Sequence, residues 1–118
     1  MTGEKIFENK VKRFLDSEGA WYIKYWAGAQ YTKTGIPDIL ACINGTFYGI
    51  EVKAMNGKPS LLQLVNLRNI RQAGGVGVLL YPDEFDRFVE FVHGSELGKY
   101  WYRDNKKKQQ HMLEKMTL

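Results

Sequence analysis

The sequence predicts an α/β fold, and three observations lead to this prediction. The aromatic segment 20–26 and the paired segments 39–43 and 46–54 have the composition of strands. Residues 60–73 have helical spacing and lead to a further apolar strand at 76–81. A helical crossover between two strands of one sheet favours a parallel, right-handed connection.

Length and composition predict one compact domain. The chain has 118 residues, of which 44% are hydrophobic, enough for a single core. The lone cysteine, Cys42, excludes a disulfide framework. No apolar run is long enough to span a membrane, and residues 1–10 lack the hydrophobic region of a signal peptide. We therefore expect a cytoplasmic protein with no membrane partner.

Charge divides the chain into two parts. Residues 1–98 contain 11 Lys and Arg against 11 Asp and Glu, whereas residues 99–118 contain six against two. We expect a main domain at 1–94 and a basic C-terminal extension at 95–118. The extension, with its Lys106, Lys107 and Lys108, is polar, of helical character, and suits either nucleic-acid binding or solubility.

The first helix is expected at residues 3–18, with Gly19 at its stop position. Glu8 shares the helical stripe of Val11 and Leu15, so it should point toward the body of the protein, where a carboxylate needs a partner or a metal. The alternative is that Glu8 lies at the edge of the stripe and pairs with Lys12 at i+4.

Aromatic and cationic residues alternate after this helix. A composition of this kind can stack on bases and touch phosphates, although most such aromatics belong to a strand face. The candidate DNA-binding residues before the tail are Lys24, Tyr31, Lys33 and Lys58.

The strongest local prediction is a hairpin. Asn44-Gly45 is the dipeptide favoured in a two-residue type I′ turn between strands 39–43 and 46–54. Pairing in this way brings Asp38, at the start of one strand, beside Glu51 and Lys53 near the end of the other. These three groups form either a metal and phosphate site or a surface cluster with a cross-strand ion pair.

Two further helices follow. Ser60 and Gln63 have the spacing of a capping box, so Gln63 is a candidate for capping the helix or for orienting a water or phosphate at the site. A later helix is expected from Asp83, as its cap, to Gly94.

The order of these motifs resembles a known family. A helix glutamate (Glu8), the G-x-P-D of Gly35 to Asp38, the E-x-K of Glu51 to Lys53 and a helix glutamine (Gln63) resemble the PD-(D/E)XK nuclease superfamily. Within it, the chain is similar to the small stand-alone VRR-NUC nucleases of phages and bacteria. The resemblance covers roughly residues 4–82.

The resemblance implies a restriction-endonuclease-like core, a mixed central sheet flanked by helices. It implies that Asp38, Glu51 and the backbone carbonyl of Val52 bind Mg²⁺ or Mn²⁺, and that Glu8 completes or buffers the metal site. Lys53 would orient or deprotonate the attacking water or stabilise the charge that develops on phosphorus. Gln63 would assist near the site.

The function expected from these residues and the resemblance is that of a Mg²⁺-dependent DNA endonuclease. Its expected substrate is branched, Holliday-junction-like DNA in replication, recombination or repair, cut by a homodimer in a bacterium or a phage-infected cell. Two alternatives remain open. One is a sequence-specific restriction-type or nicking nuclease, and the other is a non-catalytic DNA-binding accessory protein.

Overall fold

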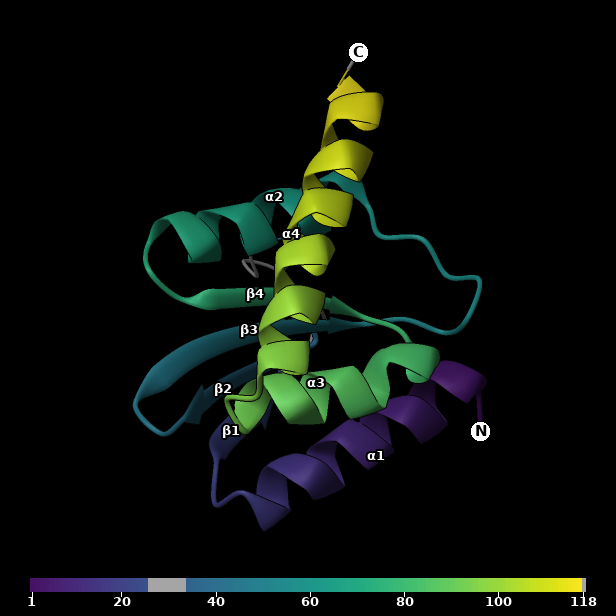
Figure 1. The fold of residues 1–118 in the computed structure, drawn as a ribbon. Coiled ribbons are helices and arrows are strands. Elements are labelled where there is room, and N and C mark those ends of the chain that lie inside the picture. The colour runs from purple at the N-terminus through teal and green to yellow at the C-terminus, as the bar shows by residue number, and fades with distance from the viewer. Residues whose placement is uncertain (26–33, 118) are drawn as a thin grey trace.

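The computed structural model describes residues 1–25 and 34–117 as a four-stranded sheet with helices on both faces (Figure 1). In chain order the elements are α1 (Gly3–Ser17), β1 (Trp21–Lys24), β2 (Ile39–Ile43), β3 (Thr46–Val52), α2 (Leu61–Gln72), β4 (Val76–Leu80), the 3₁₀ helix η1 (Pro82–Glu84), α3 (Phe85–Val92) and α4 (Glu96–Thr117). No helix of the described residues combines the length and apolar character needed to cross a bilayer.

The sheet is mixed, as predicted. The strands lie in the order β1-β2-β3-β4; β1 and β3 are antiparallel to β2, whereas β4 is parallel to β3. Asn44 and Gly45 have φ angles of 50° and 83°, the left-handed values that a type I′ turn requires. The predicted hairpin and the predicted parallel crossover are both confirmed.

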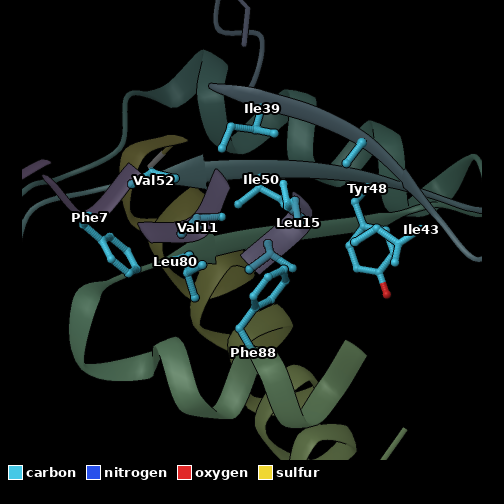
Figure 2. Packing of buried hydrophobic residues seen from close by; sticks show 12 residues of the cluster. Phe7, Val11, Leu15, Ile39, Ile43, Tyr48, Ile50, Val52, Leu80 and Phe88 are labelled. Atoms are coloured by element: carbon cyan, nitrogen blue, oxygen red, sulfur yellow. The ribbon is translucent and has the colours of Figure 1, made fainter. Parts of the chain in front are cut away.

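The main core lies on the face of the sheet covered by α1 and α3. Figure 2 shows Phe7, Val11 and Leu15 of α1 and Phe88 of α3 pointing toward strand residues such as Ile50. Each fully buried side chain of this kind contributes about 1.5–3 kcal/mol. The inward stripe predicted for the first helix is therefore confirmed, and it attaches α1 to the strands that carry the acids.

A smaller core lies on the opposite face. Leu67 of α2 packs with Leu79 of β4, Tyr81 and Met112 of α4. Because Leu79 alternates along its strand with residues of the main core, its side chain must point to the other face. Helix α2 therefore covers this face.

Several predicted boundaries differ from the structure. The strand expected at 20–26 is Trp21–Lys24, and the helix expected to run to Gly94 ends at Val92. The prediction that Asp83 caps the next helix is wrong: Asp83 lies inside η1, and α3 begins at Phe85 without a side-chain cap. The fixed φ of Pro82 suits the first position of a helical turn, so the turn begins before Asp83. The returning strand ends at Val52 rather than at residue 54, although Lys53 N–H still donates to Leu80 O at 3.0 Å.

Helix α4 spans 22 residues of the predicted extension and closes the outer edge of β4 (Figure 1). The Asn105 side chain bonds both backbone groups of Leu79, accepting from its N–H at 3.2 Å and donating to its C=O at 2.8 Å. Gln109 donates to Gly77 O at 2.9 Å, and Tyr102 Oη accepts from Gly77 N–H at 3.2 Å. Side chains of α4 thus satisfy backbone groups that a neighbouring strand would otherwise pair.

Replacing Asn105 with alanine should therefore destabilise the protein. The substitution leaves the N–H and C=O of Leu79 buried without these partners, at a cost of about 1–3 kcal/mol for each unsatisfied group. Urea denaturation followed by circular dichroism measures the change. The exposed Gln110→Ala on the same helix is the control, expected to stay within about 0.5 kcal/mol of wild type. Equal stability of the two variants would show that the edge bonds contribute little.

Candidate active site

Asp38 and Glu51 lie side by side at one end of the β2–β3 hairpin. Ile39 pairs with Ile50 in the antiparallel register, so Asp38 and Glu51 occupy the next opposed positions. Asp38 Oδ2 accepts a hydrogen bond from Val52 N–H at 3.0 Å, which fixes this carboxylate against β3. The two acids therefore converge as the hairpin predicts.

Glu51 is buried rather than part of a surface cluster. It is 1% exposed, and its Oε1 atom has no hydrogen-bond partner among the described residues. Lys53 Nζ lies 3.4 Å from Oε2. Burial, followed by the negative charge of Asp38, raises the pKa of Glu51 from 4.5 to about 8 despite this lysine. Without a cation, Glu51 therefore retains a proton at neutral pH.

Glu8 has the opposite environment. It is 3% exposed, and its carboxylate contacts Lys24 Nζ at 2.6 Å, Lys5 Nζ at 2.9 Å and Lys12 Nζ at 3.0 Å. Burial opposes its ionisation, but hydrogen bonds from the three lysines outweigh that effect and lower the pKa of Glu8 to about 2. Glu8 therefore points inward, and the alternative that it lies at the edge of the stripe is wrong, although the pair with Lys12 does form.

Lys24 connects the two carboxylate environments. Its ammonium lies 2.6 Å from Glu8 Oε1 and 3.3 Å from Asp38 Oδ1. Burial disfavours the charged ammonium, but bonds to Glu8 and the charge of Asp38 outweigh this and raise the pKa of Lys24. Lys24 therefore remains a cation between α1 and the hairpin.

The turn before Asp38 requires glycine. Gly35 has a φ of 80°, and a Cβ at this position would lie 2.6 Å from the backbone carbon of Leu62. Asn66 of α2 donates to Thr34 O at 3.1 Å and anchors the same turn. The start of α2 thus holds the G-x-P-D segment against the sheet.

Gln63 acts as a helix cap in this structure. Its Oε1 accepts from Ser60 N–H at 2.8 Å, and its own N–H donates to Ser60 Oγ at 3.2 Å. Of the two predicted roles, the capping box is the one formed. A role for Gln63 at the site stays a prediction.

The acid pair suits a hard cation. Among the described residues, no three His, Cys, Asp or Glu side chains gather as a metal-binding group. Asp38 and Glu51 nevertheless provide two neighbouring carboxylates, and the unpartnered Oε1 of Glu51 is an oxygen that a cation would satisfy. Mg²⁺ typically uses one or two carboxylates and keeps several waters, so the pair fits it.

The fold brings two of the remaining predicted DNA contacts together. Lys58 and Lys108 line an open pocket of about 390 Å³ next to the loop that follows Lys53. Lys106 lies 4.7 Å from the centre of the Tyr102 ring, and Lys107 is exposed. Tyr31 and Lys33 lie outside the described residues.

Only part of the set of lysines around Glu8 follows from the sequence. Helical spacing identified Lys12 at i+4, and the same argument could have found Lys5 at i−3. Lys24 comes from a different element, and only the folded chain brings it to Glu8.

The pKa of Glu51 predicts how stability depends on pH in metal-free buffer. Between pH 4.5 and about 8, Glu51 is ionised in the unfolded chain but protonated in the folded one, so stability should fall as pH rises, by at most about 1.4 kcal/mol per pH unit. Thermal unfolding with EDTA across this range tests it. Glu51→Gln should flatten the slope, whereas Glu8 titrates below this window and acts as an internal control. An unchanged slope in Glu51→Gln would contradict the assignment.

Comparisons with known proteins agree with this geometry. Residues 2–75 match the model of the family described as "Archaeal holliday junction resolvase (hjc)", a nuclease family of the PD-(D/E)XK superfamily. The match spans Glu8, Asp38 and Glu51, together with Lys53 and Gln63.

A solved structure described as "VRR_NUC domain" has the same fold. It is similar with a TM-score of 0.61 and 24% sequence identity over 76% of this chain and 97% of the other. A search of curated proteins finds no match. The expected resemblance to PD-(D/E)XK and VRR-NUC nucleases is confirmed, and the chain belongs to the archaeal Holliday junction resolvase family.

Proposed function

We propose that this protein is a Mg²⁺- or Mn²⁺-dependent endonuclease that hydrolyses phosphodiester bonds in branched DNA. The observation that carries the proposal is the buried Glu51, whose Oε1 is unpartnered, next to Asp38 and Lys53. The family description names Holliday junction resolvases, which supports a four-way junction as the substrate. The DNA substrate makes the cytoplasm of a bacterial or phage-infected cell the expected location.

Asp38, Glu51 and the Val52 carbonyl would hold the metal. A bound Mg²⁺ would polarise the scissile phosphate and lower the pKa of a bound water. The Val52 N–H keeps the Asp38 carboxylate in position, so little reorganisation of that ligand is needed. Glu8 would buffer this site through Lys24, which contacts both Glu8 and Asp38.

Lys53 is the proposed proton-handling or charge-stabilising group. Its ammonium already lies 3.4 Å from Glu51 and is only 14% exposed. From this position it would orient the attacking water, or neutralise the charge that develops on the phosphate oxygens. Gln63 would assist only after it releases the Ser60 N–H, so its contribution competes with the helix cap.

The cleavage prediction compares labelled four-way junction, flap, single-stranded and plain duplex DNA in Mg²⁺, Mn²⁺ or EDTA. Asp38→Ala and Lys53→Ala should each lower the cleavage rate of branched DNA by about 10²–10⁴-fold, because each removes a group that acts in the transition state. Lys99→Gln, on the exposed start of α4, is the control with wild-type activity.

Other results of the cleavage experiment would favour other functions. Cleavage of plain duplex at one fixed sequence would favour a restriction-type or nicking nuclease. Binding of junctions without cleavage in either metal would leave a DNA-binding accessory protein. The proposed homodimer would place two sites on two strands, and a protein that is monomeric on the junction would leave single-strand nicking.

Metal binding gives a prediction that does not depend on cleavage. A ligand that binds only the folded state at one hundred times its Kd stabilises it by about 2.7 kcal/mol. Saturating Mg²⁺ should therefore raise the melting temperature at pH 8, where Glu51 loses its proton more readily than at pH 6. Asp38→Asn and Glu51→Gln should abolish the increase, and an increase that survives in both would place the metal elsewhere.

The pocket next to the loop that follows Lys53 is the proposed path for a DNA backbone. Lys108 is held in place, 4.5 Å from the centre of the Tyr81 ring and 3.7 Å from Glu84 Oε1. Lys58 lines the same pocket from the loop after β3. Lys106 and Lys107 on α4, and Lys33 and Tyr31 before the hairpin, remain further proposed contacts.

Salt dependence tests this path. In EDTA, Lys58→Gln and Lys108→Gln should each weaken junction binding and reduce the slope of log K against log salt by about 1, since each lysine releases about one counterion. Lys99→Gln should retain the wild-type slope. A wild-type slope in both pocket variants would remove this pocket from the DNA-binding surface.

A further inference from the structure

The most unusual cluster outside the acid pair is the set of lysines around Glu8, here called the lysine cluster (Lys5, Lys12 and Lys24). All three ammonium groups lie within 3.0 Å of the Glu8 carboxylate. Their side chains are 41%, 22% and 18% exposed, whereas that of Glu8 is 4% exposed. One buried anion thus holds three cations that reach the surface. Because Lys24 also contacts Asp38, the three lysines and the two carboxylates together carry a net charge of +1.

Stability alone does not account for the lysine cluster. One partner is enough to compensate a buried carboxylate, and ordering lysine side chains costs conformational entropy. Lys5 and Lys12 both contact Glu8 Oε2, so their ammonium groups are at most about 6 Å apart, a distance at which like charges repel. An arrangement of this kind is suited to a second anion that shares the cations.

The position of the lysine cluster indicates which anion this is. Lys24 touches Glu8 at 2.6 Å and Asp38 at 3.3 Å, so Glu8 Oε1 and Asp38 Oδ1 are at most about 6 Å apart. The lysine cluster therefore adjoins the carboxylate proposed to bind the metal. Ammonium groups are compact charges that bind phosphate oxygens well.

We propose that Glu8 is a positioning residue that holds Lys5, Lys12 and Lys24 as a binding site for a DNA phosphodiester next to the one that is cleaved. This inference rests on the proposed nuclease function, because it takes its ligand from the substrate. Glu8 keeps the three cations together before DNA arrives, so less side-chain ordering remains to be done on binding. The surplus of positive charge then faces the substrate backbone.

The first test is the salt dependence of four-way-junction binding in EDTA, where no metal-dependent cleavage occurs. Lys5→Gln and Lys12→Gln should each reduce the slope of log K against log salt by about 1 and weaken binding about tenfold. Lys10→Gln is the control on α1, because Lys10 lies over the Phe85 ring instead of beside Glu8. Wild-type slopes in both cluster variants would overturn the proposal.

Glu8→Gln provides the sharper comparison. A change that only removes a negative charge should tighten DNA binding, whereas loss of the positioning carboxylate should weaken it and reduce the salt slope. Glu8→Asp should restore part of the slope, and Glu4→Gln, one turn earlier on α1, should leave binding at the wild-type level. The positioning role would be overturned if Glu8→Gln bound DNA more tightly than wild type. It would also be overturned if Glu8→Gln bound DNA normally but its melting temperature no longer rose in Mg²⁺.

A second test finds the phosphate itself. Neutral methylphosphonate linkages are placed one at a time around the cleavage position of the junction. One linkage next to the cut should weaken wild-type binding about tenfold but have no further effect in Lys12→Gln, since contacts of one pair are not additive. If only a terminal phosphate on a nicked product shows this dependence, the lysine cluster is a product-end site and the proposal fails.

The two proposals can fail separately. If wild type cuts no DNA in Mg²⁺ or Mn²⁺, the nuclease function fails while the binding measurements still test the lysine cluster. If Glu8→Gln does not fold, as circular dichroism would show, the Lys5 and Lys12 variants and the linkage scan test the proposal instead. Cleavage with normal phosphate dependence in those variants would refute the lysine cluster alone.

Discussion

The register of the β2–β3 hairpin is the constraint on which the site depends. Asp38 faces Glu51 because Ile39 pairs with Ile50, and the two-residue turn at Asn44 and Gly45 sets that pairing. A slip of one residue would send every side chain of a strand to the other face of the sheet. The buried stripe on the α1 side therefore keeps the acids in place, because a slip would expose the core.

The two buried glutamates, Glu8 and Glu51, have opposite pKa shifts because their surroundings differ. Glu8 has three cations and a pKa of about 2, whereas Glu51 is buried near another carboxylate with one lysine and has a pKa of about 8. Glu8 is therefore ionised and contacts three lysines. Glu51 has one lysine nearby, and its Oε1 atom has no hydrogen-bond partner among the described residues. Lys24 links the two, because it contacts both Glu8 and Asp38.

The C-terminal helix α4 stabilises the edge of the sheet, a role that its polar and basic composition does not indicate. Its polar residues Asn105 and Gln109 bond the backbone of β4, so they behave as substitutes for a fifth strand. Lys108 of the same helix lines the pocket that also contains Lys58 and Tyr81. The family match ends at residue 75, before this helix begins.

Local patterns in the sequence determined much of the architecture: the first helix, the hairpin, the capping box and the parallel crossover all follow from spacing of two or 3.6 residues and from turn chemistry. These patterns depend on residues close together in the sequence, so each element can be predicted from its own segment of the chain. The start of α3 was predicted wrongly because a helical turn begins at Pro82, before the predicted cap Asp83. The contact of Lys24 with Glu8, the bonds from Asn105 to Leu79 and the burial of Glu51 were decided only by tertiary structure. They join residues far apart in sequence, and burial, which sets the charge of each carboxylate, exists only once the elements have packed.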